Sequence, residues 1–296
     1  MNPPDAAART SPSAASKPAG VPAFLAITYA ASWICWIPMA AFMPLGPASQ
    51  VLALLGTITP SLVALWLTSR SKGSAGVRAL LDRVTPGHVA ARWYVFALGY
   101  TVAVKLAVAL IHRAVTGAWP RFGETPWFII PFAIAISTPV QAGEEIGWRG
   151  FALPRLAARF GLAPASLMLG VIWAFWHLPL FFVGWADKHG QSFFLYALQV
   201  TALSVAFAWL YVRTGGSLLL CMLLHAAVNN SKDIVPSVTP GATSVFGLQA
   251  SLVAWLTVAV LWACAAYFLA WMARTESQRA GGYLMSEGDS AAGRGP

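Results

Sequence analysis

The chain has 296 residues, of which 58% are hydrophobic and only 10% are charged. Soluble proteins carry about 45–50% apolar and about 25% charged residues, so the composition excludes a soluble globular domain of this length. The net charge of +9 does not indicate a nucleic-acid partner, because the Lys and Arg residues lie between hydrophobic runs rather than on a polar face. These runs are continuous rather than alternating, which predicts an all-α polytopic membrane protein and not a β-barrel.

Eight apolar segments have about the 20 residues that a membrane-spanning helix needs. They lie at residues 21–42, 48–67, 93–111, 126–143, 162–182, 193–212, 217–230 and 248–272, and the seventh is the shortest. We therefore predict a membrane domain over residues 21–273. The segments at residues 1–20 and 274–296, rich in small and polar residues, are predicted to be disordered tails.

The basic residues predict the orientation of these spans. With the N-terminus inside, 14 of the 19 Lys and Arg residues fall on the cytoplasmic side, and Lys105 falls within the third span. Only four basic residues fall on the outer side of the membrane: Arg113, Arg121, Lys188 and Lys232. Cytoplasmic loops of membrane proteins carry such an excess. We predict a multi-pass protein of the cell membrane, surrounded by lipid, with both termini in the cytoplasm.

Residues 144–160, after the fourth span, keep a helical spacing of apolar residues and include three arginines. This pattern predicts that the fourth helix emerges from the membrane and bends near Gly150 or Pro154. It would then run along the cytoplasmic interface as an amphipathic segment.

An ionisable residue inside the hydrocarbon region costs at least about 2.5–3.5 kcal/mol on insertion scales, so each one needs a reason. Glu144 and Glu145 lie at the inner end of the fourth span. Glu145 precedes Arg149 by four residues, which favours an ion pair on one helix face. Glu144 is rotated about 100° from Glu145 and needs another partner, so it is free for proton transfer. Lys105 carries no motif, and we predict that it snorkels and is structural.

Two later spans also bring polar groups into the membrane. His177 follows Trp173 by four residues in the fifth span, and His225 precedes Asn229 by four in the seventh, with Cys221 one turn earlier. Each group alone is typical of hydrogen bonds between membrane helices. Their convergence on three spans, in a membrane region with few other polar residues, favours a catalytic site.

The spacings Glu-Glu-x-x-x-Arg, aromatic-x-x-x-His and His-x-x-x-Asn resemble the motifs of the CPBP family. This family comprises the CAAX proteases and bacteriocin-processing enzymes, also called the ABI or type II CAAX prenyl endopeptidase family. The resemblance covers residues 139–230 and is carried by Glu144, Glu145 and Arg149; Trp173 and His177; and His225 and Asn229. The family is similar in having around eight hydrophobic helices. It commonly has Phe at the position of Trp173, a difference that we expect to alter the shape of the pocket and not the chemistry.

The resemblance implies an intramembrane endopeptidase. The predicted topology places these residues, and therefore the hydrolysis of the peptide bond, near the cytoplasmic side. Glu144 would be the general base, and His177 would position and polarise the attacking water. His225 and Asn229 would donate hydrogen bonds to the oxyanion. Glu145, Arg149 and Trp173 of the same motifs would have supporting roles.

The sequence favours a glutamate mechanism without a metal and with no cofactor. Zinc is the alternative, because Glu144, His177 and His225 would supply three ligands and leave one open position. No His-Glu-x-x-His motif is present, and each ligand would come from a different helix. The expected substrate is a peptide or a membrane protein, and no nucleic acid is expected.

Three other classes of protein could carry these residues. A nucleophilic Cys-His enzyme would use Cys221, but a thiol in an apolar helix is unreactive, and three cysteines indicate no disulfide framework. A transporter could use the same Glu and His residues, although no internal repeat is visible. A non-enzymatic membrane scaffold or immunity protein would keep the motifs and act by binding.

Overall fold

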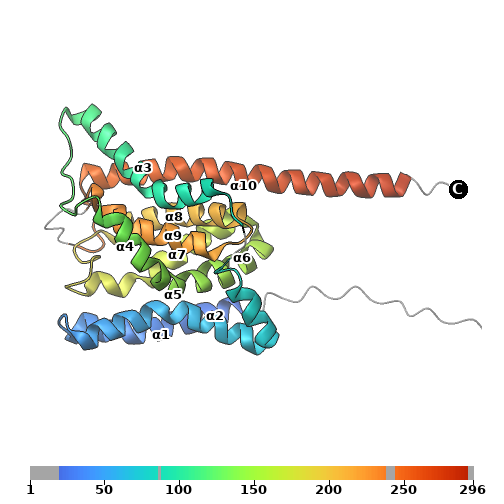
Figure 1. Cartoon of the computed structure of the whole chain (residues 1–296), viewed down its shortest axis with the longest axis horizontal. Coiled ribbons are helices and arrows are strands. Elements are labelled where there is room, and N and C mark those ends of the chain that lie inside the picture. The colour runs from blue at the N-terminus through green and yellow to red at the C-terminus, as the bar shows by residue number, and fades with distance from the viewer. Residues whose placement is uncertain (1–19, 86–87, 238–243, 293–296) are drawn as a thin grey trace, which may run out of the picture.

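The computed structural model describes residues 20–85, 88–237 and 244–292, with side chains described up to residue 275. Within these ranges the regular elements are all helices, so the predicted all-α class is confirmed. Successive long helices run in opposite directions through one bundle, and α1 begins at the end of the bundle from which α10 leaves (Figure 1). The predicted disordered tail at residues 1–20 lies almost wholly outside the described residues.

Within the described residues the chain passes through the bundle eight times, at the places where the sequence has its eight apolar segments. Six of the described helices are long and apolar enough to cross a membrane. The other two passes are the interrupted stretch α4–α6 and the short α9, and these two carry the glutamates and His225. The passes are α1 (Val21–Phe42), α2 (Pro47–Leu81), α3 (Ala91–Thr116), residues 129–160, α7 (Leu162–Trp176) with a 3-10 turn (Leu178–Phe182), α8 (Phe193–Arg213), α9 (Leu218–Ser231) and α10 (Leu252–Ala292).

The ends of the helices follow from local sequence. Ser192 and Ser217 precede α8 and α9, and their side chains accept hydrogen bonds from the third backbone N–H beyond them. Gly161 lies between α6 and α7 with φ of 84°, a conformation that glycine adopts readily. A single residue therefore reverses the chain from the fourth pass into the fifth.

The fourth pass changes its helical type four times. It runs from α4 (Ile129–Ser137) through a 3-10 turn (Thr138–Gln141) into α5 (Ala142–Glu145), then through a π-helix (Ile146–Ala152) into α6 (Leu153–Phe160). Gly147 in the π-helix lies against α2, where an added Cβ would come within 2.6 Å of the Pro60 backbone. Short π-helices are rare and often occur at functional sites.

This pass corrects two predictions. Glu144 lies near the middle of residues 129–160 rather than at the inner end of a span, because the helix continues past it. The π-helix is fully buried, so the amphipathic surface segment is limited to α6. The sequence suggested an earlier exit because charges begin at Glu144, but Glu144 and the Glu145–Arg149 ion pair are buried inside the bundle.

Two helices are longer than predicted. α2 continues to Leu81 across a non-helical residue, Gly73, where the sequence predicted an end near residue 67. α10 remains helical to Ala292, where a disordered tail was predicted from residue 274. Polar, Ala-containing sequence can continue a helix beyond the apolar part, so the apolar run marks the span and not the end of the helix.

Among the six candidate membrane spans, α8 is the most deeply buried. Two thirds of its apolar window is buried (67%), against 28% for α1 and 39% for α2, α3 and α10. The outer helices expose large apolar side chains, as expected where a protein faces lipid. The pairs α7–α8 and α8–α9 pack at the centre of the bundle, where the predicted site residues lie.

Candidate active site

A cavity of about 480 Å³ lies inside the bundle and brings the predicted catalytic residues together. Glu144 enters it from the fourth pass, His177 from the end of α7, and His225 and Asn229 from α9. Trp173 also lines it. Glu145 and Arg149 do not line the cavity and lie behind it. The three motifs, far apart in the sequence, therefore meet at one place.

Glu144 is held by a hydrogen bond that the sequence did not predict. The indole Nε1 of Trp173 donates to Oε2 of Glu144 at 2.7 Å, and the glutamate is only 5% exposed. Oε1 is thus the carboxylate oxygen left for a water molecule. A Phe at position 173 would keep an aromatic ring but could not make this bond.

The tautomer of His177 follows from its hydrogen bond. Its Nδ1 lies 2.9 Å from the carbonyl oxygen of Trp173, and because a carbonyl only accepts, Nδ1 carries the hydrogen. In the neutral ring Nε2 is then an acceptor. Trp36, Trp176 and Tyr196 surround the ring with centroids 4.7–6.3 Å away. The ring is therefore fixed in one orientation.

Behind the cavity, one carboxylate joins two motifs. Oε1 of Glu145 accepts from Arg149 Nη1 at 3.0 Å, which is the predicted ion pair, and lies 2.7 Å from Nδ1 of His225. Glu145 and Arg149 are fully buried, and the guanidinium lies 4.2 Å from the ring centroid of Trp173 and 4.1 Å from that of Phe207. Such cation–π contacts stabilise a desolvated cation. The pair therefore holds the first motif against α9 and orients His225.

Asn229 differs from the other site residues because it is exposed. Its Nδ2 lies 3.5 Å from Oε1 of Gln141, a long contact. Gln141 also lines the cavity, three residues before Glu144. This i,i+3 spacing was the available sequence signal for Gln141, and it was missed. The Asn229 amide thus remains able to reorient towards a bound group.

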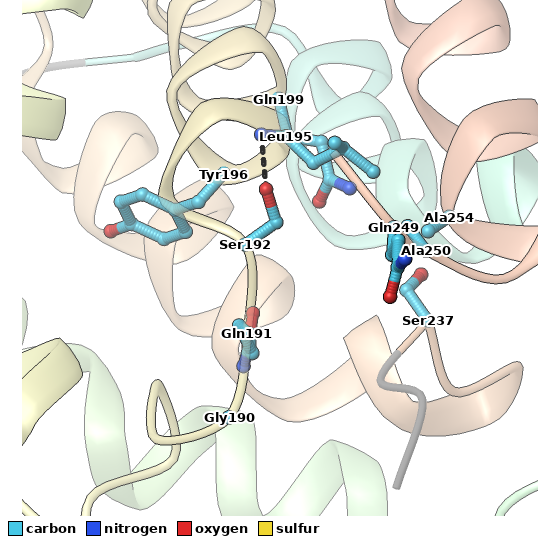
Figure 2. Close-up of a pocket in the computed structure, with 10 residues that line it drawn as sticks. All are labelled: Gly190, Gln191, Ser192, Leu195, Tyr196, Gln199, Ser237, Gln249, Ala250 and Ala254. Atoms are coloured by element: carbon cyan, nitrogen blue, oxygen red, sulfur yellow. Dashed lines mark hydrogen bonds between the residues drawn. The ribbon is translucent and has the colours of Figure 1, made fainter. Parts of the chain in front are cut away.

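The mouth of the cavity lies at one end of the bundle. Asp187, Lys188 and Gln191 of the α7–α8 loop and Lys232 after α9 form this part of the lining. Asp187 pairs with Lys188 at 3.1 Å and with Lys232 at 3.7 Å. Burial raises the pKa of Asp187, but the two ammonium groups outweigh it and hold the pKa below its ordinary value. A smaller pocket of about 30 Å³ beside the mouth includes Gln191 as well (Figure 2).

Two alternatives can be compared with this geometry. Cys221 is buried but does not line the cavity, so it is not placed as a nucleophile. Within the described part of the chain, no three His, Cys, Asp or Glu side chains lie close enough together to hold a metal ion. Glu144, His177 and His225 share the cavity but do not form a zinc-binding cluster as they stand.

Comparisons with known proteins agree with the motifs. Residues 125–231 match the family model described as type II CAAX prenyl endopeptidase Rce1-like. Over 101 residues the chain is 29% identical to the CAAX prenyl protease 2 of Methanococcus maripaludis, covering 31% of this chain and 36% of that protein. The chain thus spans about a third of the length of that relative. Both matches confirm the predicted resemblance to the type II CAAX prenyl endopeptidases. It runs from the start of the fourth pass to the end of α9 and contains every site residue that the sequence predicted.

Proposed function

We propose that this membrane protein is an intramembrane endopeptidase in which Glu144 activates a water molecule. The observation that supports it most is the cavity in which Glu144, His177, His225 and Asn229 meet within a buried, mainly helical frame. In such a site water is scarce and electrostatic contacts are strong. The family match and the relative named CAAX prenyl protease 2 point to the same class of reaction.

The proposed chemistry uses the free atoms of these side chains. Glu144 takes one proton from the water through Oε1, while Nε2 of His177 accepts a hydrogen bond from the other O–H of the water and so orients it. The water oxygen attacks the peptide carbonyl carbon, and the carbonyl oxygen becomes an oxyanion. Asn229 donates its amide N–H to that oxygen. Glu144 then passes its proton to the leaving nitrogen as the carbon–nitrogen bond breaks.

His225 needs a particular protonation state for its proposed role. Its Nδ1 is directed at the Glu145 carboxylate, so Nδ1 carries a hydrogen. To donate to the oxyanion as well, Nε2 must also be protonated, which makes the ring an imidazolium. The adjacent Glu145 carboxylate stabilises that cation. His225 and Glu145 would thus act together.

The Trp173 hydrogen bond gives a prediction about pH. Trp173→Phe removes the donor to Glu144, and because that bond favours the ionised carboxylate, its loss moves the acidic limb of the kcat/KM profile to higher pH. The matched control is Trp176→Phe, since the Trp176 N–H has no partner among the described atoms. Equal profiles for the two variants would contradict this role for Trp173.

We further propose that the reaction needs no metal ion. In the described structure Glu144, His177 and His225 do not lie close enough together to bind one zinc ion. No step of the proposed reaction therefore uses a metal. Purified protein treated with excess EDTA should keep its cleavage rate, and elemental analysis should find well under one zinc per chain. Loss of activity on chelation, with recovery on adding zinc, would show that the ligand set assembles and that the metal-independent mechanism is wrong.

We also propose to which side of the membrane the cavity opens. The mouth lies at the end of the bundle opposite to the start of α1 and the exit of α10 (Figure 1). The basic residues still favour cytoplasmic termini, so we propose that the mouth opens towards the outer side. This proposal differs from the sequence prediction of cleavage near the cytoplasmic side.

Cysteine labelling tests the orientation. With Cys35, Cys221 and Cys264 replaced, a single cysteine is introduced at Glu124, near the mouth end, or at Arg78, near the other end; both positions are exposed. In intact cells a membrane-impermeant maleimide should label Glu124→Cys and not Arg78→Cys. The reverse pattern would place the mouth in the cytoplasm.

A direct test of the function is a cleavage assay in liposomes. The purified protein is reconstituted and incubated with a peptide library, and the products are identified by mass spectrometry. New peptide ends that depend on Glu144 support the proposal. Binding of peptides without any cleavage would favour a scaffold, and solute uptake that persists in Glu144→Gln would favour a transporter.

A further inference from the structure

Tryptophans and arginines gather where three helices meet, at the end of the bundle from which α10 leaves (Figure 1). Trp93 lies in the first turn of α3, and Arg213 is the last residue of α8. Trp271 lies one turn before the apolar part of α10 ends at Thr275, and α10 packs against both α3 and α8. An apolar span begins or ends near the membrane surface, so this group lies at that level, where tryptophans of membrane proteins are enriched.

The indole rings hold two guanidinium groups close together. The guanidinium carbon of Arg213 lies 5.1 Å from the ring centroid of Trp93 and 5.1 Å from that of Trp271. The guanidinium carbon of Arg92 lies 5.3 Å from the same Trp93 ring. Trp93 is only 8% exposed and packs against Trp209 with 5.4 Å between the ring centroids, so this ring is fixed. Cation–π contacts of this kind orient a guanidinium group and leave the N–H donors at its edge for another partner.

Both of these charges lack a counter-ion. Arg92 and Arg213 are exposed, and no ion pair among the described residues includes either of them. Like charges that lie close together repel each other, and an anion that contacts both removes this repulsion. Lys105 differs, because it is 4% exposed, donates to the Val235 carbonyl oxygen and does not snorkel as predicted. The arginine pair, unlike Lys105, can thus be reached by an anion from outside the protein.

The surface next to the two arginines indicates which anion fits. Val95 and Leu98 follow Arg92 by three and six residues on α3 and are 70% and 40% exposed. On α10, Tyr267 precedes Trp271 by one turn and is 65% exposed. Exposed side chains of this kind are expected where a protein faces lipid, so an anion bound here lies between acyl chains and water. That is the position of a phospholipid phosphate. The basic residues favour the cytoplasmic side for this end of the bundle, and the cytoplasmic leaflet is rich in phospholipids that carry a net negative charge.

We propose that Arg92 and Arg213 form a binding site for the headgroup of a phospholipid with a net negative charge. The phosphate accepts hydrogen bonds from both guanidinium groups, and the acyl chains lie along the exposed apolar side chains of α3. The two arginines come from α3 and α8, and Trp271 comes from α10. One bound lipid therefore contacts three helices and stabilises their packing at this end. The site lies outside the catalytic cavity and does not rest on the proposed peptidase activity.

Lipid binding to the purified full-length protein tests the site. The protein in detergent is titrated with phosphatidylglycerol, with phosphatidylcholine of the same acyl chains, or with glycerol 3-phosphate, and the bound molecules are counted by native mass spectrometry. Phosphatidylglycerol should bind about tenfold more tightly than phosphatidylcholine, which corresponds to one charge-assisted hydrogen bond. It should also raise the midpoint of thermal unfolding. Glycerol 3-phosphate should not displace the lipid at equal concentration; if it does, the site takes a free phosphate and the lipid proposal is wrong.

Substitutions attribute this preference to the two arginines. Arg92→Gln and Arg213→Gln should each reduce the preference for phosphatidylglycerol, and the double variant should bind both lipids equally. The single variants cover the case in which the double variant does not fold. The matched control is Arg159→Gln, which should keep the preference, because Arg159 is exposed and lies 5.0 Å from the ring centroid of Phe160 without a second arginine among the described contacts of that ring. The proposal is overturned if phosphatidylglycerol binds no more tightly than phosphatidylcholine, if the preference survives the substitutions of Arg92 and Arg213, or if Arg159→Gln reduces it equally.

Discussion

Replacing Glu144 with Gln is expected to lower kcat for peptide cleavage by about 10²–10⁴, the usual contribution of a general base. The substitution preserves the volume of the side chain and an oxygen that can accept from the Trp173 indole. Substrate binding should therefore change little, and the loss should appear in kcat rather than in KM. Steady-state cleavage of one peptide in liposomes measures both constants.

The matched control for this prediction is Glu124→Gln. Glu124 lies in the exposed segment after α3 and pairs only with Arg121 on the surface. The same chemical change there should leave the cleavage rate unaltered. If Glu144→Gln cleaves within a few-fold of the unmodified protein while both variants fold, Glu144 is not the base.

Replacing Arg149 with Met is expected to lower the free energy of unfolding by about 3–5 kcal/mol, because it removes the guanidinium that pairs with the buried Glu145 carboxylate. Glu145 would retain only the contact to His225. The guanidinium contacts to Trp173 and Phe207 would also be lost. Thermal denaturation in detergent, followed by tryptophan fluorescence, should show a midpoint several degrees lower.

Arg159→Met is the control for stability. Arg159 lies in the same helical pass, but in the exposed part of α6, where a substitution usually changes stability by less than about 0.5 kcal/mol. Equal midpoints for the two variants would show that the buried ion pair does not stabilise the fold. A lower midpoint for Arg149→Met alone would identify the pair as a structural support.

Local patterns predicted much of the fold and part of the site. The apolar runs predicted the eight passes because a span needs a fixed length of apolar residues. The i,i+4 spacing predicted the Glu145–Arg149 pair because such residues are neighbours on one helix turn. Both inferences depend on sequence distances that the helix itself fixes.

The missed features depend on contacts between helices. Trp173 and Glu144 are 29 residues apart, His225 and Glu145 are 80 apart, and Lys105 meets Val235 across 130 residues. No periodicity within one helix encodes these pairs. The sequence could show that Lys105 lies in a span but not that the segment after α9 supplies its acceptors. The depth of Glu144 was missed for a related reason, since a run of charged residues buried inside a bundle has the same sequence pattern as the start of a loop.

The π-helix at Ile146–Ala152 has a consequence for how the gene can change. The bond from Leu153 N–H to Trp148 spans five residues instead of four, so this turn holds one residue more than an α-helix. Deleting any one of its residues would allow an ordinary α-helix, but the upstream part would then rotate by about 100° relative to α6. Both glutamates would turn away from the helices they contact. A deletion that improves the local helix is therefore expected to be selected against, whereas most surface loops of the chain can lose a residue.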